Sequence, residues 1–163
     1  MLWEVEILPI GSEKDYEGQR ILASADSQGI SGLSTVTSAR TFLIQGDLTR
    51  EDAKRAAEQL LVDPVTEQFS IHELPDTRSS DLVPRSSLLN VLLHPGVTDS
   101  VAENAAKALT RLNLSVTNVA TCRRYWLTGE LSSAKVAHLS KKVLANDAIE
   151  YVITGPLQLA DLT

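Results

Sequence analysis

The stretch ARTFLIQGDLT at residues 39–49 returns in the second half of the chain as CRRYWLTGELS at residues 122–132. The two stretches share an arginine, a glycine and a leucine, and an aromatic residue of one stands opposite an aromatic residue of the other. The correspondence continues without a gap to residues 71 and 154, with further identities at Leu61/Leu144 and Glu67/Glu150. A repeat of about 80 residues is too long for a solenoid unit and has the size of a small domain. The sequence therefore predicts two related units in one chain.

Each unit is expected to run strand, helix, strand, strand, helix, strand. In the first unit, alternation predicts strands near residues 3–7, 33–37, 40–45 and 67–74, and 3.6-residue spacing predicts helices near residues 15–28 and from Thr49. The second unit has the same order, with a clear helix at residues 100–113. This βαββαβ order predicts an α+β, ferredoxin-like fold with the helices on one face of an antiparallel sheet. A lone unit of this size buries little of its surface, so we expect the two to pack as an intrachain pseudo-dimer.

Domain boundaries follow from the repeat. We place the first unit at residues 1–75, a linker at 76–87, the second unit at 88–155 and a tail at 156–163. The linker is polar, contains prolines and shows neither structural period, so it is expected to be the most mobile internal segment. Its Arg78 and Arg85 are the expected first tryptic sites. The tail suits continuation into a following domain, and a standalone tandem subunit is the alternative.

Composition narrows the class of protein. The chain has 163 residues, of which 43% are hydrophobic and 22% charged, which is typical of a globular domain. Fifteen basic against 21 acidic residues give a net charge of −6, which argues against nucleic-acid and membrane-surface binding. No apolar run approaches the ~20 residues of a membrane span. A lone Cys122 favours a reducing compartment, most simply the cytoplasm.

Motifs that carry chemistry are missing from the sequence. There is no Walker loop, GxGxxG or HExxH motif. His72, His94 and His138 have no nucleophile motif beside them, and three histidines with one cysteine leave little for a metal site. Cys122 takes the position of Ala39 in the repeat, so we expect a small core-facing residue rather than a reactive thiol. The sequence predicts no catalytic residue, metal or cofactor in this chain.

The densest polar and aromatic cluster is Arg123, Arg124, Tyr125 and Trp126. Arginine, tyrosine and tryptophan are enriched where protein surfaces meet. The cluster therefore predicts a partner interface. The alternative is a strand whose arginines are solvated while Tyr125 or Trp126 fills the core.

Three segments of the second unit resemble the PurS family. They are LHPGVTD at residues 93–99, Arg124-Tyr125, and VLANDAIE at residues 143–150. PurS has a Lys-Pro-Gly-Val-x-Asp-Pro segment after its first strand, Gly-Lys-Tyr on its third, and Leu-Leu-Ala-Asn-Pro-Val-Ile-Glu after its second helix. Here His94 replaces the lysine and Asp147 the helix-ending proline, which the first unit keeps as Pro64. The resemblance is strong in the second unit and weak in the first.

The resemblance implies a function without chemistry of its own. PurS is the small subunit of phosphoribosylformylglycinamidine synthase, which makes the amidine from formylglycinamide ribonucleotide, ATP and glutamine in purine biosynthesis. It implies that this chain bridges a PurL-type synthetase and a PurQ-type glutaminase, with ATP and Mg²⁺ in the synthetase. The large single-chain synthetase begins with a domain that resembles a PurS dimer, as a tandem duplication would. The residues expected to meet a partner are Arg40, His94, Arg123, Arg124, Tyr125 and Trp126. On this reading, Arg124→Ala leaves stability unchanged and weakens assembly.

A second class of protein stays open. Paired βαββαβ units also form ACT-type regulatory modules, which bind amino acids at the dimer interface through a glycine-containing loop after the first strand. Gly11 and Pro95-Gly96 stand at such positions here. Calorimetry against amino acids and nucleotides separates the two classes.

Overall fold

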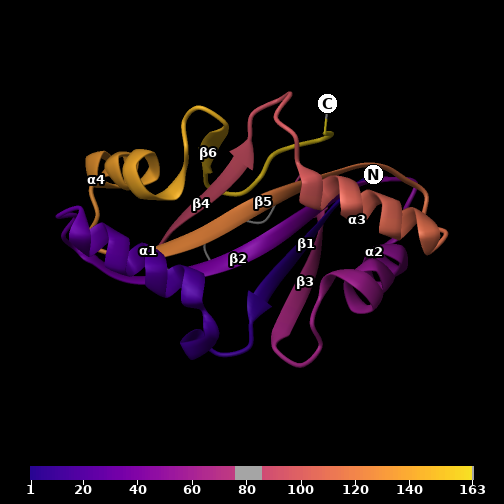
Figure 1. The fold of residues 1–163 in the computed structure, drawn as a ribbon, viewed down its shortest axis with the longest axis horizontal. Coiled ribbons are helices and arrows are strands. Elements are labelled where there is room, and N and C mark those ends of the chain that lie inside the picture. The colour runs from indigo at the N-terminus through magenta and orange to yellow at the C-terminus, as the bar shows by residue number, and fades with distance from the viewer. Residues whose placement is uncertain (76–85, 163) are drawn as a thin grey trace.

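A computed structural model describes residues 1–75 and 86–162 of the chain, and Arg78 and Arg85 lie outside them. In this part of the chain, six strands form one antiparallel sheet in the order β3-β1-β2-β5-β4-β6, accompanied by four α-helices (Figure 1). The α+β class with an antiparallel sheet is therefore confirmed. The elements are β1 (Leu2–Pro9), η1 (Ser12–Lys14), α1 (Tyr16–Ser27), β2 (Leu33–Gly46), α2 (Arg50–Ala56), η2 (Ala57–Leu61), β3 (Glu67–Leu74), β4 (Ser86–Leu93), α3 (Ser100–Arg111), β5 (Val116–Gly129), α4 (Ser133–Leu139), η3 (Ser140–Leu144) and β6 (Glu150–Thr154).

The two middle strands expected in each unit are a single strand of 14 residues, β2 in the first half and β5 in the second. The prediction of βαββαβ was wrong at this point, and each half reads βαβαβ. The stretch VTSA at residues 36–39 has no glycine, proline or asparagine to make a turn, so nothing bends the chain back. β2 and β5 instead pair with each other from Leu33/Gly129 to Gly46/Val116.

All four helices lie on one face of the sheet. Val36, Phe42 and Ile44 share a face of β2 because side chains alternate along a strand, and all three contact helix-side cores. One core packs α2 and α3 over β1, and the other packs α1 and α4 over β4. In Figure 1, α1 and α4 accordingly lie at one end of the sheet and α2 and α3 at the other. Each half thus places its first helix over its own long strand and beside the second helix of the other half.

The opposite face of the sheet carries a smaller apolar cluster, which includes Leu2, Leu43 and Cys122. Leu157, from the segment expected to be a tail, is buried in this cluster. The Leu162 N–H donates to Gln45 Oε1 at 3.0 Å, which fixes the end of the segment beside β2. The tail therefore packs on the sheet up to Leu162. The predicted linker also ends earlier than residue 87, because β4 begins at Ser86.

Candidate functional site

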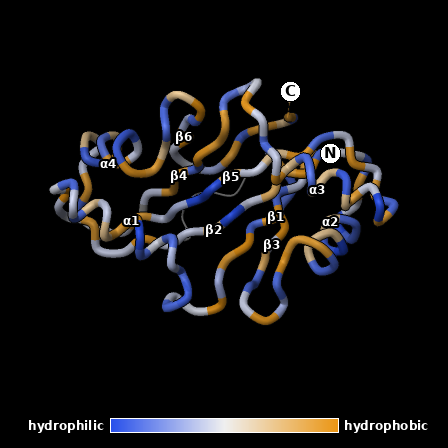
Figure 2. Tube along the Cα trace, viewed as in Figure 1, coloured by the Kyte–Doolittle hydropathy of each residue, from blue (hydrophilic) through white to orange (hydrophobic). Residues whose placement is uncertain are grey.

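Arg40 and Arg123 lie directly opposite each other where β2 and β5 pair. The register around them is regular from Thr35/Thr128 to Gln45/Asn118, so this pair stands at its centre. Figure 2 shows hydrophilic segments of the two strands side by side at the middle of the sheet. Both arginines lie on the helix side and are partly open to solvent, with 47% of the Arg40 side chain and 39% of the Arg123 side chain exposed. The repeat therefore brings two of the predicted interface residues together.

Arg40 is held by the turn that follows η2. Its Nη2 donates to the Leu61 carbonyl at 2.9 Å and to Glu67 Oε1 at 2.6 Å, and its guanidinium lies over the Phe42 ring. Burial raises the pKa of Glu67, but hydrogen bonds from Arg40 and from the Asp63 N–H outweigh it and hold that pKa below its usual value. Arg40 thus holds the turn through an ion pair and a hydrogen bond, while part of the Arg40 side chain remains exposed to solvent.

Arg123 makes the same contacts in the second half. Its Nη2 donates to the Leu144 carbonyl at 2.9 Å and to Glu150 Oε2 at 2.6 Å. Its Nη1 donates to the Tyr125 hydroxyl at 3.0 Å, and that hydroxyl donates to Glu17 Oε1 at 2.8 Å. Since Glu17 lies on α1, this chain of bonds ties the first helix to the second half.

Tyr125 is completely buried in the core under α1 and α4. Burial is the main cause that raises the pKa of its hydroxyl. Of the two alternatives for the aromatic pair, Tyr125 is therefore the one that fills the core, and it offers no surface to a partner. Trp126 is half-buried on the other face of the sheet, opposite Thr37 in the strand pairing.

The position of Arg124 differs from the exposed position expected from the sequence. Arg124 points to the face opposite Arg123, because consecutive strand residues alternate, and it is only 4% exposed. Its guanidinium pairs with Glu4 and, at 2.5 Å, with Glu6, while its Nε donates to Asn90 Oδ1 at 2.7 Å. The strand neighbour opposite Arg124 is the small Ala39, which leaves room for the side chain to reach β1. Arg124 is therefore a buried tie between the halves, and the premise that it is exposed is wrong.

The partners of Arg124 were not predicted, because the alternation of Glu4 and Glu6 with apolar residues is typical of a half-buried strand. A signal was present in Asn90, a lone polar residue inside the apolar run from Leu88 to Leu93. A buried amide needs a hydrogen-bond partner, so Asn90 indicates a polar group on a neighbouring strand.

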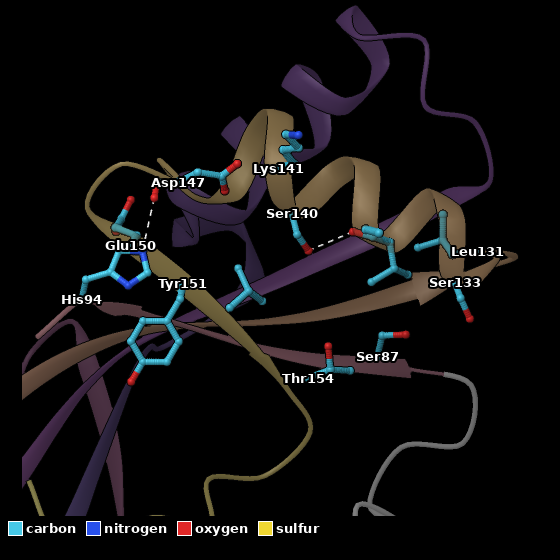
Figure 3. A pocket seen from close by; sticks show the side chains of 13 residues that line it. Ser87, His94, Leu131, Ser133, Ser140, Lys141, Asp147, Glu150, Tyr151 and Thr154 are labelled. Atoms are coloured by element: carbon cyan, nitrogen blue, oxygen red, sulfur yellow. Dashed lines mark hydrogen bonds between the residues drawn. The ribbon is translucent and has the colours of Figure 1, made fainter.

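His94 lies apart from the central arginines, at the end of β4. Its ring stacks on Tyr151 with centroids 5.4 Å apart, and its Nε2 lies 3.2 Å from the Asp147 carbonyl oxygen. Both rings border a cleft of about 730 Å³ between α4 and β6, which is also lined by Lys141 and Val152 (Figure 3).

Cys122 is buried on the helix-free face, which confirms the expected core position. Burial is the main cause that raises the pKa of its thiol to about 12. The thiolate that nucleophilic chemistry requires is therefore disfavoured.

No protein-family model matches the chain, and no curated protein matches its sequence. Within residues 1–75 and 86–162, no group of three or more His, Cys, Asp or Glu side chains is placed to hold a metal ion. In the same residues, no helix combines the length and the apolar character needed to cross a membrane.

Proposed function

We propose that the chain is a tandem duplication of a PurS-like unit that forms its own dimer-like platform. On this proposal it is a cytoplasmic, non-catalytic component of phosphoribosylformylglycinamidine synthase that couples a PurL-type synthetase to a PurQ-type glutaminase. ATP and Mg²⁺ belong to the synthetase. The observation that carries the proposal is the pair of matching contact sets centred on Arg40 and Arg123.

The two sets share two bonds of each arginine. Each arginine donates from Nη2 to a leucine carbonyl at 2.9 Å and to a glutamate at 2.6 Å, and all three residues stand at corresponding positions of the repeat. The helix before each turn also ends the same way, in a π-helical segment, η2 or η3. Five identities in the sequence are weak support for a duplication, whereas agreement of the bonds they make is much stronger.

A further contact occurs in both halves, although the residues that make it lie outside the two aligned stretches. Asp15 caps α1 and accepts the Ser38 N–H at 2.7 Å, and Asp99 caps α3 and accepts the Thr121 N–H at 2.9 Å. Ser38 and Thr121 directly precede the two aligned stretches, so they too correspond in the repeat. This device fixes the first helix of each half to the middle of its long strand, and it supports a common origin of the halves.

The PurS-like segments fall on these shared features. In VLANDAIE, Glu150 accepts the Asn146 N–H at 3.0 Å, and Asn146 Oδ1 accepts the Ala148 N–H at 3.1 Å, which closes the turn that Arg123 holds. The similarity therefore lies in residues that build the turn beside the central pair of arginines. This supports a PurS-like architecture, and the function is carried over from the resemblance.

We expect Arg123 to contact a partner, since its guanidinium is ion-paired yet 39% of its side chain is exposed. Arg123→Ala should weaken the complex with the synthetase about tenfold or more, as truncation of a central interface arginine does. It should also lower the free energy of unfolding by about 1–3 kcal/mol, because Glu150, which is only 15% exposed, and the Leu144 carbonyl lose a charged hydrogen-bond donor.

The test mixes the chain with synthetase and glutaminase and measures assembly by size exclusion and binding by calorimetry. Arg111→Ala, an exposed arginine at the end of α3, is the control that should bind as the parent chain does. A parent chain that joins neither protein would contradict the proposal. A heat of binding with free amino acids would favour the sensing module instead.

A further inference from the structure

The edge strand β6 is open to a further strand. The His94 N–H donates to the Ile149 carbonyl, and the Gly155 N–H to the Leu88 carbonyl, both at 2.8 Å. Hydrogen-bonded and non-bonded pairs alternate in an antiparallel ladder, so the N–H and C=O groups of Val152 and Thr154 point away from β4. Because β6 is the last strand of the sheet that residues 1–75 and 86–162 form, these groups face an edge that no strand of the described residues covers. A free edge of this kind is a template for strand addition.

The corresponding edge of the first half is partly covered. There Arg50 reaches over β3 and donates from Nη2 to the Ile71 carbonyl at 3.2 Å. Phe69 packs against the core beside it. At the corresponding positions of the repeat, the second half has Ser133, Val152 and Thr154. The side chains that partly cover β3 are thus replaced by small ones at β6.

The cleft next to β6 is larger than the cleft of about 410 Å³ beside Phe69 in the first half. It has a volume of about 730 Å³, and its apolar lining includes Leu131, Val136, Ala137 and Val152. The polar Ser133, Ser140 and Lys141 lie along α4 and η3 (Figure 3). Alternate side chains of a strand added to β6 would point into this space.

The helical segment along one side of the cleft carries an excess of positive charge, although the chain has a net charge of −6, and its Lys141 lines the cleft. Residues 133–144 contain Lys135, His138, Lys141 and Lys142 and no acid. The matching segment of the first half, residues 50–61, balances three basic residues with three acidic ones. Of the acids near the cleft, Glu150 is paired with Arg123, and Asp147 lies at the His94 end. The free positive charge on α4 and η3 therefore favours an acidic occupant.

We propose that β6 accepts an extended acidic segment of a partner protein as a seventh strand of the sheet. The backbone of this segment forms hydrogen bonds with the backbone of Val152 and Thr154. The side chains that the segment directs toward α4 alternate between apolar and acidic, and the acidic side chains reach Lys141. Glu150, the ion-pair partner of Arg123, lines the cleft, whereas Arg40 and Arg123 themselves are not among its lining residues. The inference does not rest on the proposed function.

The probe is a short fluorescent peptide in which every second residue is threonine. The residues between the threonines alternate between valine and glutamate. Its binding to the full chain is measured by fluorescence anisotropy, against a control peptide with lysine in place of glutamate. We expect the acidic peptide to bind and the basic one to bind at least about tenfold more weakly. Equal binding of the two peptides, or binding of neither, would overturn the proposal.

Two variants locate the site. Val152→Phe and Ser133→Arg each introduce the side chain that partly covers the edge of the first half, and each should weaken binding of the acidic peptide about tenfold or more. Circular dichroism checks the fold, and either variant suffices if the other does not fold. Arg50→Ser, which opens the other edge, should leave this binding unchanged. Undiminished binding of the peptide by both variants would refute the assignment. Self-association of the chain that is abolished by Val152→Phe would also refute it, because a second copy of the chain would then be the occupant.

Discussion

Replacing Arg124 by alanine is expected to lower the free energy of unfolding by about 3–5 kcal/mol, the cost of removing one partner of a buried ion pair. Glu4 and Glu6 would lose a common cation, and Glu4 is only 1% exposed. Urea unfolding followed by circular dichroism measures the change.

Lys54→Ala is the control for this measurement. Lys54 lies 4.0 Å from Glu58 on the surface, with about half of each side chain exposed. Its removal should cost no more than about 0.5 kcal/mol. A loss of less than 1 kcal/mol for Arg124→Ala (roughly the value of an exposed pair) would show that Arg124 does not hold the halves together.

Cleavage between the halves is expected to leave them joined. Limited trypsin treatment at Arg78 or Arg85 breaks the chain outside the described residues, while β2 and β5 stay paired along 14 residues each. Ile21 of α1 and Leu109 of α3 are fully buried, each in a core that contains residues of both halves. Separation would expose both apolar side chains to water, at ~1.5–3 kcal/mol each.

Size exclusion in native buffer should show the nicked halves eluting with the intact chain, and in urea they should elute apart. Halves that separate in native buffer would mean two independent domains joined by a linker. The crossed packing of α1 and α3 would then be wrong as well.

The local structure was largely readable from the sequence. Thr49, Asp99 and Ser132 begin helices as their side chains predict, each accepting the backbone N–H three residues on. The prediction of two strands, near residues 33–37 and 40–45, was wrong because it assumed a unit whose chain folds back on itself at this point. Whether a strand turns back or continues depends on a partner strand in the other half of the chain, which local propensity does not contain.

The placement of the candidate residues was less predictable. Arg123 and Arg124 are neighbours in sequence, yet one is part of the central pair and the other is buried on the opposite face. Alternation separates the faces of a strand, but it does not say which face is covered. Here both faces are partly covered, one by helices and the other by residues of the C-terminal segment such as Leu157. The bond between Arg124 and Glu4 spans 120 residues, so no local pattern points to it.

The proposed bridging function is tested most directly by comparing nitrogen donors for the synthetase. Synthetase and glutaminase are assayed for amidine formation from formylglycinamide ribonucleotide and ATP, with and without this chain, supplied with either glutamine or free ammonia. We predict that the chain is required with glutamine, that it makes little difference with ammonia, and that alone it turns over neither ATP nor glutamine. Equal glutamine-dependent rates with and without the chain, or steady ATP turnover by the purified chain alone, would contradict the proposal.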